Sequence, residues 1–290
     1  MTQNIVWLHV ESTSRCNAWC PFCPRNNQGY GLAKDLLVED LAVDKLQKVI
    51  QHFSNLHTVQ LCGNLGDPLA AKNIDNQIDM ILEFDNIKNI QIHTNGSLRN
   101  KDWWKRLVEK TKKINLTVWF TIDGNEKNHS LYRQGTSYSK ILENASAFIN
   151  AGGKAIWQFI LFDHNKNDVA ECYNLSQTLG FYDFKLLKNV RSDKKSYHYK
   201  TGKQLFIKNY DSKSVQKPIP SVMTVEKKNC MHLSYPSMYL NARGQLSPCC
   251  YLDQKAISAD DIVKSFENQS FFQKCIVSCG NQILSSKKTL

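Results

Sequence analysis

Short β-prone runs alternate with amphipathic helical segments over the first two thirds of this chain, and this alternation restricts the possible folds more than any other feature. Strand followed by helix, repeated, predicts a parallel sheet. The pattern alone leaves an open doubly wound sheet and a partial barrel equally possible. The strand-like runs are residues 5–10, 58–61, 87–93, 114–122, 155–162 and 183–187, and the helical segments are residues 37–53, 74–84, 102–112, 139–151 and 168–179.

Three cysteines, Cys16, Cys20 and Cys23, follow the first strand-like run. A loop at the carboxyl end of a strand is where α/β sheets place their chemistry. Three thiolates on one loop can bind three corners of a cuboidal iron–sulfur cluster and leave one iron open. A structural zinc loop is the alternative interpretation, but it would need a fourth cysteine or histidine close by. The nearest histidine after Cys23 is His52, inside a helical segment.

This loop, with Phe22 directly before the third cysteine, resembles the radical S-adenosylmethionine (radical SAM) superfamily. The resemblance implies a partial (β/α)6 TIM-like barrel that holds a [4Fe-4S] cluster on these cysteines. It also implies S-adenosylmethionine as the cosubstrate, chelated by the open iron and placed close to Phe22. One-electron reduction would cleave it to methionine and a 5′-deoxyadenosyl radical, which abstracts hydrogen from a substrate.

Turns after the second and third strand-like runs extend the resemblance. Gly66-Asp67-Pro68 is similar to the family's Gly-Glu-Pro motif, whose backbone receives the amino group of the cosubstrate; aspartate in place of glutamate is a departure. Thr94 and Asn95 belong to a Thr-Asn-Gly turn that the family places beside the ribose.

A third turn, after the fourth strand-like run, resembles the family's Ser-Ile-Asp-Gly stretch. It contains Thr121 and Asp123, followed by His129 and Arg133. The resemblance implies that the Thr121 hydroxyl and Arg133 lie near the ribose and the methionine carboxylate. No catalytic acid or base can be assigned from the sequence. Six residues near strand ends or in the following segment are equal candidates: His129, Asp163, His164, Lys188, Tyr197 and Tyr199.

A second group of cysteines begins at Cys230. Residues 238–240 and 244–246 flank Asn241-Ala242-Arg243 and predict a short hairpin, with Cys249 just beyond it. The region resembles the auxiliary-cluster domain of radical SAM enzymes, in the short form called twitch rather than the full SPASM form. The expected ligands of an auxiliary [4Fe-4S] cluster are Cys230, Cys249, Cys275 and Cys279, with Cys250 as a substitute. A zinc ribbon is the alternative.

We therefore expect a partial barrel over residues 1–205, a connection over 206–229 and the auxiliary domain over 230–290. With 42% apolar and 22% charged residues, the chain is typical of globular proteins, and neither a membrane span nor a secretory signal is evident. Ten cysteines without such a signal indicate a reducing, cytoplasmic setting. The net charge of +11 suggests anionic partners, and the basic segment 191–203 is the nearest candidate for contacting one.

The leading functional hypothesis is a radical SAM enzyme that oxidises or rearranges a small polar metabolite, with the auxiliary cluster as electron acceptor. Its partners would be that substrate and a one-electron reductant such as flavodoxin or ferredoxin. A peptide-modifying maturase is the second hypothesis, which we disfavour because the chain begins almost directly at the first strand. A zinc-stabilised protein that binds nucleic acid is the third; we disfavour it because it leaves the ordered motifs at the strand ends unexplained. A clear run of basic residues interleaved with exposed aromatics is also not evident.

Overall fold

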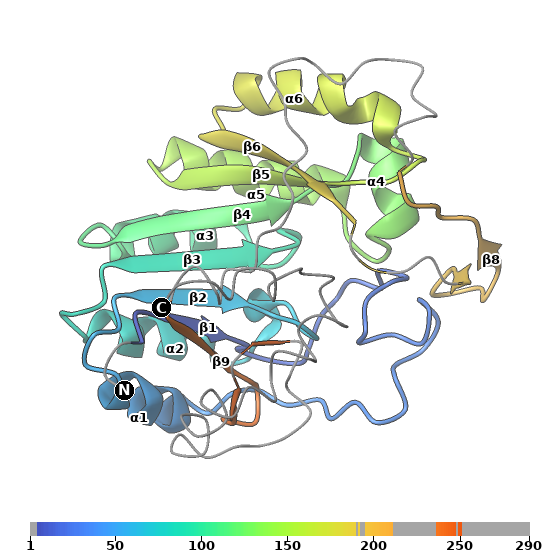
Figure 1. Ribbon diagram of the computed structural model, residues 1–290. Helices are drawn as coiled ribbons and strands as arrows, with labels where there is room; N and C mark the ends of the chain where they lie inside the picture. Colours follow the sequence, from blue (N-terminus) through green and yellow to red (C-terminus); the bar gives the residue numbers. More distant parts are fainter. Residues whose placement is uncertain (1–4, 190, 192–194, 211–235, 248, 251–290) are drawn as a thin grey trace, which may run out of the picture.

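The computed structural model describes residues 5–189, 191, 195–210, 236–247 and 249–250. One sheet in this part of the chain has the strand order β10-β9-β1-β2-β3-β4-β5-β6 (Figure 1). Its strands are β1 (Trp7–Val10), β2 (Thr58–Cys62), β3 (Asn89–Thr94), β4 (Asn115–Thr121), β5 (Lys154–Leu161), β6 (Asp183–Lys188), β9 (Ser237–Leu240) and β10 (Leu246–Ser247). Strands β1 to β6 pair in parallel and in chain order, so the predicted α/β fold with a parallel sheet is confirmed.

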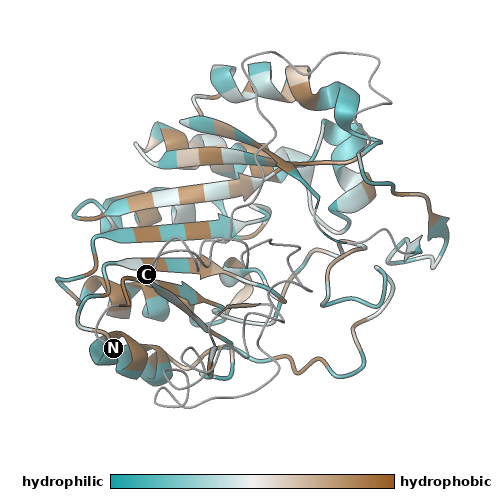
Figure 2. Cartoon of the chain, viewed as in Figure 1, coloured by the Kyte–Doolittle hydropathy of each residue, from teal (hydrophilic) through white to brown (hydrophobic). Residues whose placement is uncertain are grey.

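Helices cover one face of this sheet (Figure 1). They are α1 (Val43–His52), α2 (Ile74–Leu82), α3 (Lys101–Lys110), α4 (Glu126–Tyr132), α5 (Tyr138–Asn150) and α6 (Val169–Thr178), with short 3-10 turns η2 (Pro68–Ala70) and η3 (Lys166–Asp168). Alternate strand residues and the apolar helix faces form one buried core, which explains the colour alternation along the strands in Figure 2. The other strand residues face away from the helices.

The first helix begins later than the sequence pattern predicts. It starts at Val43, whereas residues 37–42 are extended and run beside the segment that precedes the cysteines. The amide N–H of Leu41 donates to the Ser12 carbonyl at 2.9 Å, and that of Ser14 donates to the Glu39 carbonyl at 2.9 Å. Bonds to a distant segment therefore replace the helical bonds that the local pattern favours.

The predicted C-terminal hairpin is confirmed, because β9 and β10 pair antiparallel with Leu246 opposite Leu240. The sequence did not indicate where this hairpin lies. Strand β9 pairs in parallel with β1, placing Trp7 opposite Ser237, so the hairpin extends the barrel sheet at its first strand. A second small hairpin, β7 (Ser196–Tyr197) and β8 (Gln204–Leu205), lies apart from the main sheet. None of the helices described here is long and apolar enough to cross a membrane.

Candidate functional site

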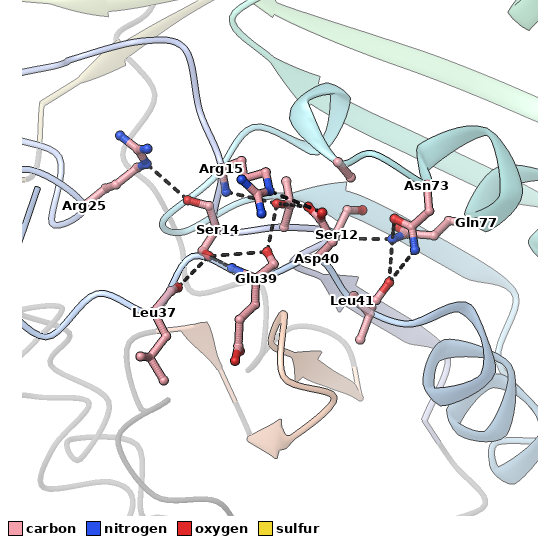
Figure 3. Close-up of polar contacts among 12 residues, drawn as sticks. Ser12, Ser14, Arg15, Arg25, Leu37, Glu39, Asp40, Leu41, Asn73 and Gln77 are labelled. Atoms are coloured by element: carbon pink, nitrogen blue, oxygen red, sulfur yellow. Dashed lines mark hydrogen bonds and ion pairs between the residues drawn. The ribbon is translucent and has the colours of Figure 1, made fainter.

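Polar contacts hold the segment that leads into the loop of Cys16, Cys20 and Cys23, here called the cysteine loop (Figure 3). The Thr13 hydroxyl lies 2.6 Å from Oδ1 of Asp40, and Nε of Arg15 lies 3.2 Å from Oδ2 of the same carboxylate. The Ser14 hydroxyl donates to the Leu37 carbonyl at 2.7 Å. From α2, the buried Gln77 amide donates to the Ser12 carbonyl at 3.3 Å. These bonds pair backbone polar groups of the segment and fix the position at which the chain enters the cysteine loop.

The cysteines themselves lie at the carboxyl ends of the strands. Cys20 is buried, whereas Cys16 and Cys23 are half-buried, and no disulfide joins the cysteines in the described ranges. Burial raises the pKa of the thiols of Cys16 and Cys20; for Cys20, the nearby charge of Arg133 opposes that shift. Within the same ranges, no three histidine, cysteine or acidic side chains are grouped closely enough to hold a single metal ion.

The turn after β2 packs directly against the cysteine loop. The amide N–H of Asp67 donates to the Arg15 carbonyl at 2.8 Å. A Cβ atom on Gly66 would lie 1.9 Å from the Thr13 carbonyl oxygen, so only glycine permits this approach. Pro68 is buried and opens η2, whose first turn the Asp67 carboxylate caps by accepting from Leu69 N–H at 3.0 Å.

The Asp67 side chain also joins this turn to the turn after β3. It accepts a hydrogen bond from the Thr94 hydroxyl at 2.9 Å and from the Asn95 amide N–H at 2.7 Å. Burial raises the pKa of this carboxyl group, and the N–H donors oppose the shift. The Asn95 side-chain amide then reaches the cysteine loop, 2.9 Å from Oδ1 of Asn17 and 3.9 Å from Sγ of Cys16.

The turn after β4 reaches the same loop through Arg133. Its Nε lies 2.6 Å from Oδ2 of Asp123, and its Nη1 lies 3.6 Å from Sγ of Cys20. Asp123 is fully buried, and its other oxygen accepts from the Ile160 amide N–H at 2.7 Å. Burial raises the pKa of this carboxyl group, against the opposing effect of Arg133. The turns after β2 and β3 thus contact the cysteine loop directly, and the turn after β4 is connected to it through Arg133 at the end of α4.

Phe22 and Thr121 occupy different surroundings. Phe22 is buried in an aromatic cluster, with ring centroids 5.8 Å from Tyr132 and 6.1 Å from Phe162. Cys16 and Cys23 pack against the same cluster, which therefore forms an apolar wall beside the thiols. The buried Thr121 hydroxyl lies 3.5 Å from Nε2 of Gln158 on the neighbouring strand.

His129 is the most constrained of the six candidates for an acid or base. It is fully buried, its Nδ1 accepts from the Asp123 amide N–H at 3.1 Å, and its Nε2 lies 3.0 Å from the Thr136 hydroxyl. Because that hydroxyl donates to the Arg133 carbonyl, Nε2 carries the proton. Burial, aided by Arg133, lowers the pKa of His129 to about 3. These contacts indicate a structural role for His129.

The other five candidates occupy varied settings. Asp163 pairs with Lys166 at 2.7 Å, and Lys188 is exposed at the end of β6. His164 stacks on Phe162, with ring centroids 5.4 Å apart, and burial lowers its pKa to about 4. The two tyrosines, Tyr197 and Tyr199, lie on or beside strand β7.

The β7–β8 hairpin lies beside the cysteine loop. The amide N–H of Tyr197 donates to the Gln28 carbonyl at 2.9 Å, and Tyr199 stacks on Trp19 with centroids 6.0 Å apart. Upstream, the Arg191 guanidinium reaches the Phe22 carbonyl at 3.4 Å. The described part of the basic segment 191–203, which is Arg191 and residues 195–203, thus lies beside the cysteine loop. Its lysines Lys195, Lys200 and Lys203 are exposed.

Sequence reasoning missed a belt of polar and aromatic side chains on the sheet face opposite the helices. Register pairs His93 with Trp119, and Gln158 with both Thr121 and Lys185. Both Gln158 and Lys185 are half-buried, and Nζ of Lys185 lies 3.1 Å from Oδ2 of Asp183. The rings of His93 and Trp119 stack with centroids 4.9 Å apart. A detectable signal is present in β3, where Asn89, Gln91 and His93 are polar at every second position.

Two cysteines of the C-terminal group are described. Cys249 is buried and Cys250 is half-buried, and the Cys250 carbonyl accepts from the Asn64 side chain at 3.1 Å. The chain just beyond the C-terminal hairpin therefore touches the turn that contains Gly66. Cys230, Cys275 and Cys279 lie outside the described residues.

Comparison with known families and sequences gives consistent matches. The model of the Radical SAM superfamily matches residues 10–175, more than half of the chain. The GTP 3′,8-cyclase of Aquifex aeolicus is 28% identical over 185 residues, 61% of this chain and 56% of that protein. The GTP 3′,8-cyclase of Haemophilus influenzae is 23% identical over 288 residues, 92% of this chain and 84% of that protein. The chain spans about half the length of the first relatives it matches.

Solved structures show the same fold at low identity. SuiB from Streptococcus suis, bound to S-adenosylmethionine, superposes with a TM-score of 0.64 and 15% identity, covering 91% of this chain and 66% of that chain. BtrN, in complex with AdoMet and 2-DOIA, superposes with a TM-score of 0.50 and 14% identity, covering 97% of this chain and 89% of that chain. At 14–15% identity, the similarity to these two structures shows a shared fold and nothing further.

Proposed function

Because the chain belongs to the radical SAM superfamily, we propose that Cys16, Cys20 and Cys23 hold a [4Fe-4S] cluster at which S-adenosylmethionine is reductively cleaved. The observation that carries this proposal is the convergence of three strand-end turns on one cysteine loop, with Arg133 at 3.6 Å from Sγ of Cys20 and Asn95 at 3.9 Å from Sγ of Cys16. When bound, the cluster would supply one electron and one open iron site.

The donor set suits such a cluster. Soft thiolate ligands favour iron–sulfur clusters or zinc over hard cations. Burial disfavours the free thiolates of Cys16 and Cys20, and both the metal charge and the N–H donors from Arg133 and Asn95 would offset that cost. The apolar wall at Phe22 would limit the access of water to the sulfurs.

The proposed contacts to S-adenosylmethionine follow the motifs. The backbone around Gly66, held by Asp67 and Pro68, receives the amino group. Arg133 has donors beyond those at Nε and Nη1 used in the described contacts, and these would bind the carboxylate. Two further elements, Thr94-Asn95 and Thr121, would contact the ribose, and Phe22 would lie close to the bound cosubstrate.

We assign the substrate to the class of small polar metabolites. The belt of Gln158, Lys185 and His93 offers amide, ammonium and imidazole groups on the sheet face away from the helices. Such a set suits a ligand with hydroxyl, carboxylate or phosphate groups. The sequence relatives are named as cyclases of a nucleotide, GTP, which belongs to this class. The alternative substrate is a peptide, and SuiB, a neighbour in fold, has been solved bound to a precursor peptide.

An auxiliary [4Fe-4S] cluster on Cys230, Cys249, Cys275 and Cys279 is proposed as the acceptor of the substrate electron. The 5′-deoxyadenosyl radical would take a hydrogen atom from the substrate to give 5′-deoxyadenosine, and the substrate radical would then lose one electron to this cluster. The contact of Asn64 with the Cys250 carbonyl supports the proposal, because it brings one cysteine of the second group to the turn that contains Gly66.

A one-electron reductant of the flavodoxin or ferredoxin type is the proposed protein partner. The exposed lysines of the β7–β8 hairpin lie beside the cysteine loop, where an acidic protein could approach the cluster.

The test is to reconstitute the protein anaerobically and measure iron, sulfide, the electron paramagnetic resonance (EPR) spectrum and 5′-deoxyadenosine after reduction. Wild type should contain about eight irons in two cubane clusters, and the variant with Cys16, Cys20 and Cys23 changed to alanine should keep about four. Only wild type should form 5′-deoxyadenosine and show a signal that S-adenosylmethionine perturbs.

Zinc in place of iron at both cysteine groups, with no 5′-deoxyadenosine, would refute the radical function and favour the nucleic-acid hypothesis. Two iron clusters and 5′-deoxyadenosine, but turnover only with a peptide, would instead support the maturase alternative.

A further inference from the structure

The side chain of Glu11 is a buried carboxylate that contacts the turn after β2. It follows the last residue of β1 and is 1% exposed. Its Oε1 accepts from the amide N–H groups of Leu65 at 2.5 Å and Gly66 at 3.0 Å. Its Oε2 accepts from the hydroxyl of Tyr239. Three donors on one carboxylate compensate the cost of burying its charge.

This arrangement orients two peptide carbonyls. In a planar trans peptide the carbonyl points opposite to the N–H of the next residue. Because the N–H groups of Leu65 and Gly66 point at Glu11, the carbonyls of Asn64 and Leu65 point away from it. A hydrogen bond from N–H to a carboxylate also polarises the peptide and makes its carbonyl a stronger acceptor. Glu11 thus orients and polarises the carbonyl groups of Asn64 and Leu65, which can accept hydrogen bonds from a cation.

The C-terminal strand holds Glu11 in this position. Tyr239 on β9 is fully buried, and its ring packs edge-on against His9 with centroids 5.0 Å apart. The same turn also contacts the chain just beyond the C-terminal hairpin, where the Asn64 side chain donates to the Cys250 carbonyl. The turn that contains residues 64–66 is therefore positioned both by Glu11, which follows β1, and by the C-terminal part of the chain.

We propose that Glu11 is the positioning residue for the ammonium group of S-adenosylmethionine, and that Tyr239 makes this recognition depend on the docked C-terminal strand. This inference rests on the proposed function, which assigns the ammonium to the turn at Gly66. Glu11 acts through the peptides of residues 64–66 and does not itself touch the ligand.

The experiment measures the dissociation constants of S-adenosylmethionine and of its analogue with hydrogen in place of the amino group, on reconstituted full-length protein. Glu11→Ala should weaken binding of S-adenosylmethionine about tenfold and leave binding of the analogue within about twofold. Glu11→Gln should stay within about threefold of wild type, because the amide oxygen still accepts both N–H groups. Tyr239→Phe should weaken binding about threefold to fivefold.

Two controls separate positioning from stability. Tyr173→Phe removes a hydroxyl from the half-buried tyrosine of α6 that packs on Phe184. Leu175→Ala destabilises the same helix and should not change the ratio of the two dissociation constants. If Glu11→Ala does not fold, Tyr239→Phe still tests the ratio.

The inference is overturned if Glu11→Ala and Tyr239→Phe bind S-adenosylmethionine within twofold of wild type. It is equally overturned if both ligands weaken in parallel, as a structural role alone would cause. Wild-type protein that binds no S-adenosylmethionine would instead contradict the proposed function itself, so the two failures can be distinguished.

Discussion

The guanidinium group of Arg133 donates to the sulfur of Cys20, with Nη1 and Sγ 3.6 Å apart. Its other edge pairs with the fully buried carboxylate of Asp123. One side chain thus connects the turn after β4 to the cysteine loop.

Removing this guanidinium should destabilise the fold. Arg133→Ala leaves Asp123 buried without its cation, which costs about 3–5 kcal/mol of unfolding free energy, and Asp123→Asn in the same chain should recover part of it. Urea unfolding of the metal-free protein measures the loss of unfolding free energy in Arg133→Ala and its recovery in the double variant. The control is Lys101→Ala, which breaks the exposed pair with Glu143 and should cost less than about 1 kcal/mol. If Arg133→Ala and Lys101→Ala lose the same unfolding free energy, Arg133 does not stabilise the fold through its pair with Asp123.

His129 should make stability depend on pH. Its pKa is lowered by burial, to about 3, so the unfolded chain binds the proton more readily than the folded chain. The contribution is therefore complete above the unfolded pKa of about 6.5 and is lost as pH falls towards 3, at about 1.4 kcal/mol per pH unit. His129→Asn, whose amide oxygen can replace Nδ1, should reduce the loss measured by urea unfolding between pH 7 and pH 5. His164 should still contribute to the pH dependence of the unfolding free energy in this variant. If the slope of unfolding free energy against pH is the same in His129→Asn as in wild type, His129 is not a source of the dependence.

Gly66→Ala should disrupt the cysteine loop. The new Cβ would lie 1.9 Å from the Thr13 carbonyl, a backbone atom that can yield only if the loop moves. We expect less than half of the wild-type iron after reconstitution. Gly152→Ala is the control, because Gly152 has a positive φ of 96° but open space around its Cβ position, and about 1 kcal/mol of strain should leave the iron content unchanged. Full iron content in Gly66→Ala would show that the loop tolerates the displacement.

Lys185→Gln should separate substrate turnover from cosubstrate cleavage. Removing this half-buried ammonium should leave the binding of S-adenosylmethionine and basal 5′-deoxyadenosine formation unchanged. It should abolish any stimulation of that reaction by a low-molecular-mass ultrafiltrate of cell extract. Lys188→Gln, on the exposed end of the same strand, is the matched control. Stimulation that persists in Lys185→Gln, or comes only from the protein fraction, would argue against the belt as the site of a small metabolite.

Reversing the charge of the β7–β8 hairpin should weaken reduction by a protein donor. The variant with Lys195, Lys200 and Lys203 changed to glutamate should lose about tenfold in rate with flavodoxin at low salt and keep its rate with dithionite. The rate with flavodoxin should also depend less on ionic strength than in wild type. Three exposed lysines elsewhere, Lys105, Lys112 and Lys113, give a charge-matched control. Equal losses in the two variants would show a general effect of net charge.

Local sequence features predicted the repeating part of the fold well. Strand and helix periods, and the turn residues between them, depend on neighbours along the chain, so a parallel α/β sheet could be inferred. The order β1 to β6 did not follow from these periods, which fit a doubly wound sheet equally well. The start of α1 could not, because residues 37–42 take their hydrogen bonds from the segment of Ser12 and Ser14, more than twenty residues away. The belt of Gln158 and Lys185 was missed for a related reason: its members share a face only once the register of β5 and β6 is known.

The sequence by itself determined that three thiols follow the first strand and that glycine-containing turns follow the next strands, because these features are local. The tertiary structure decided which of them meet. Parallel register brings the turns of Asp67, Asn95 and Asp123 to one edge, and β9 pairs with β1 to bring Tyr239 to Glu11, 228 residues away along the chain. Contacts across such separations follow no period in the sequence. They depend on the free energy of the whole packed sheet, which the three-dimensional structure alone reveals.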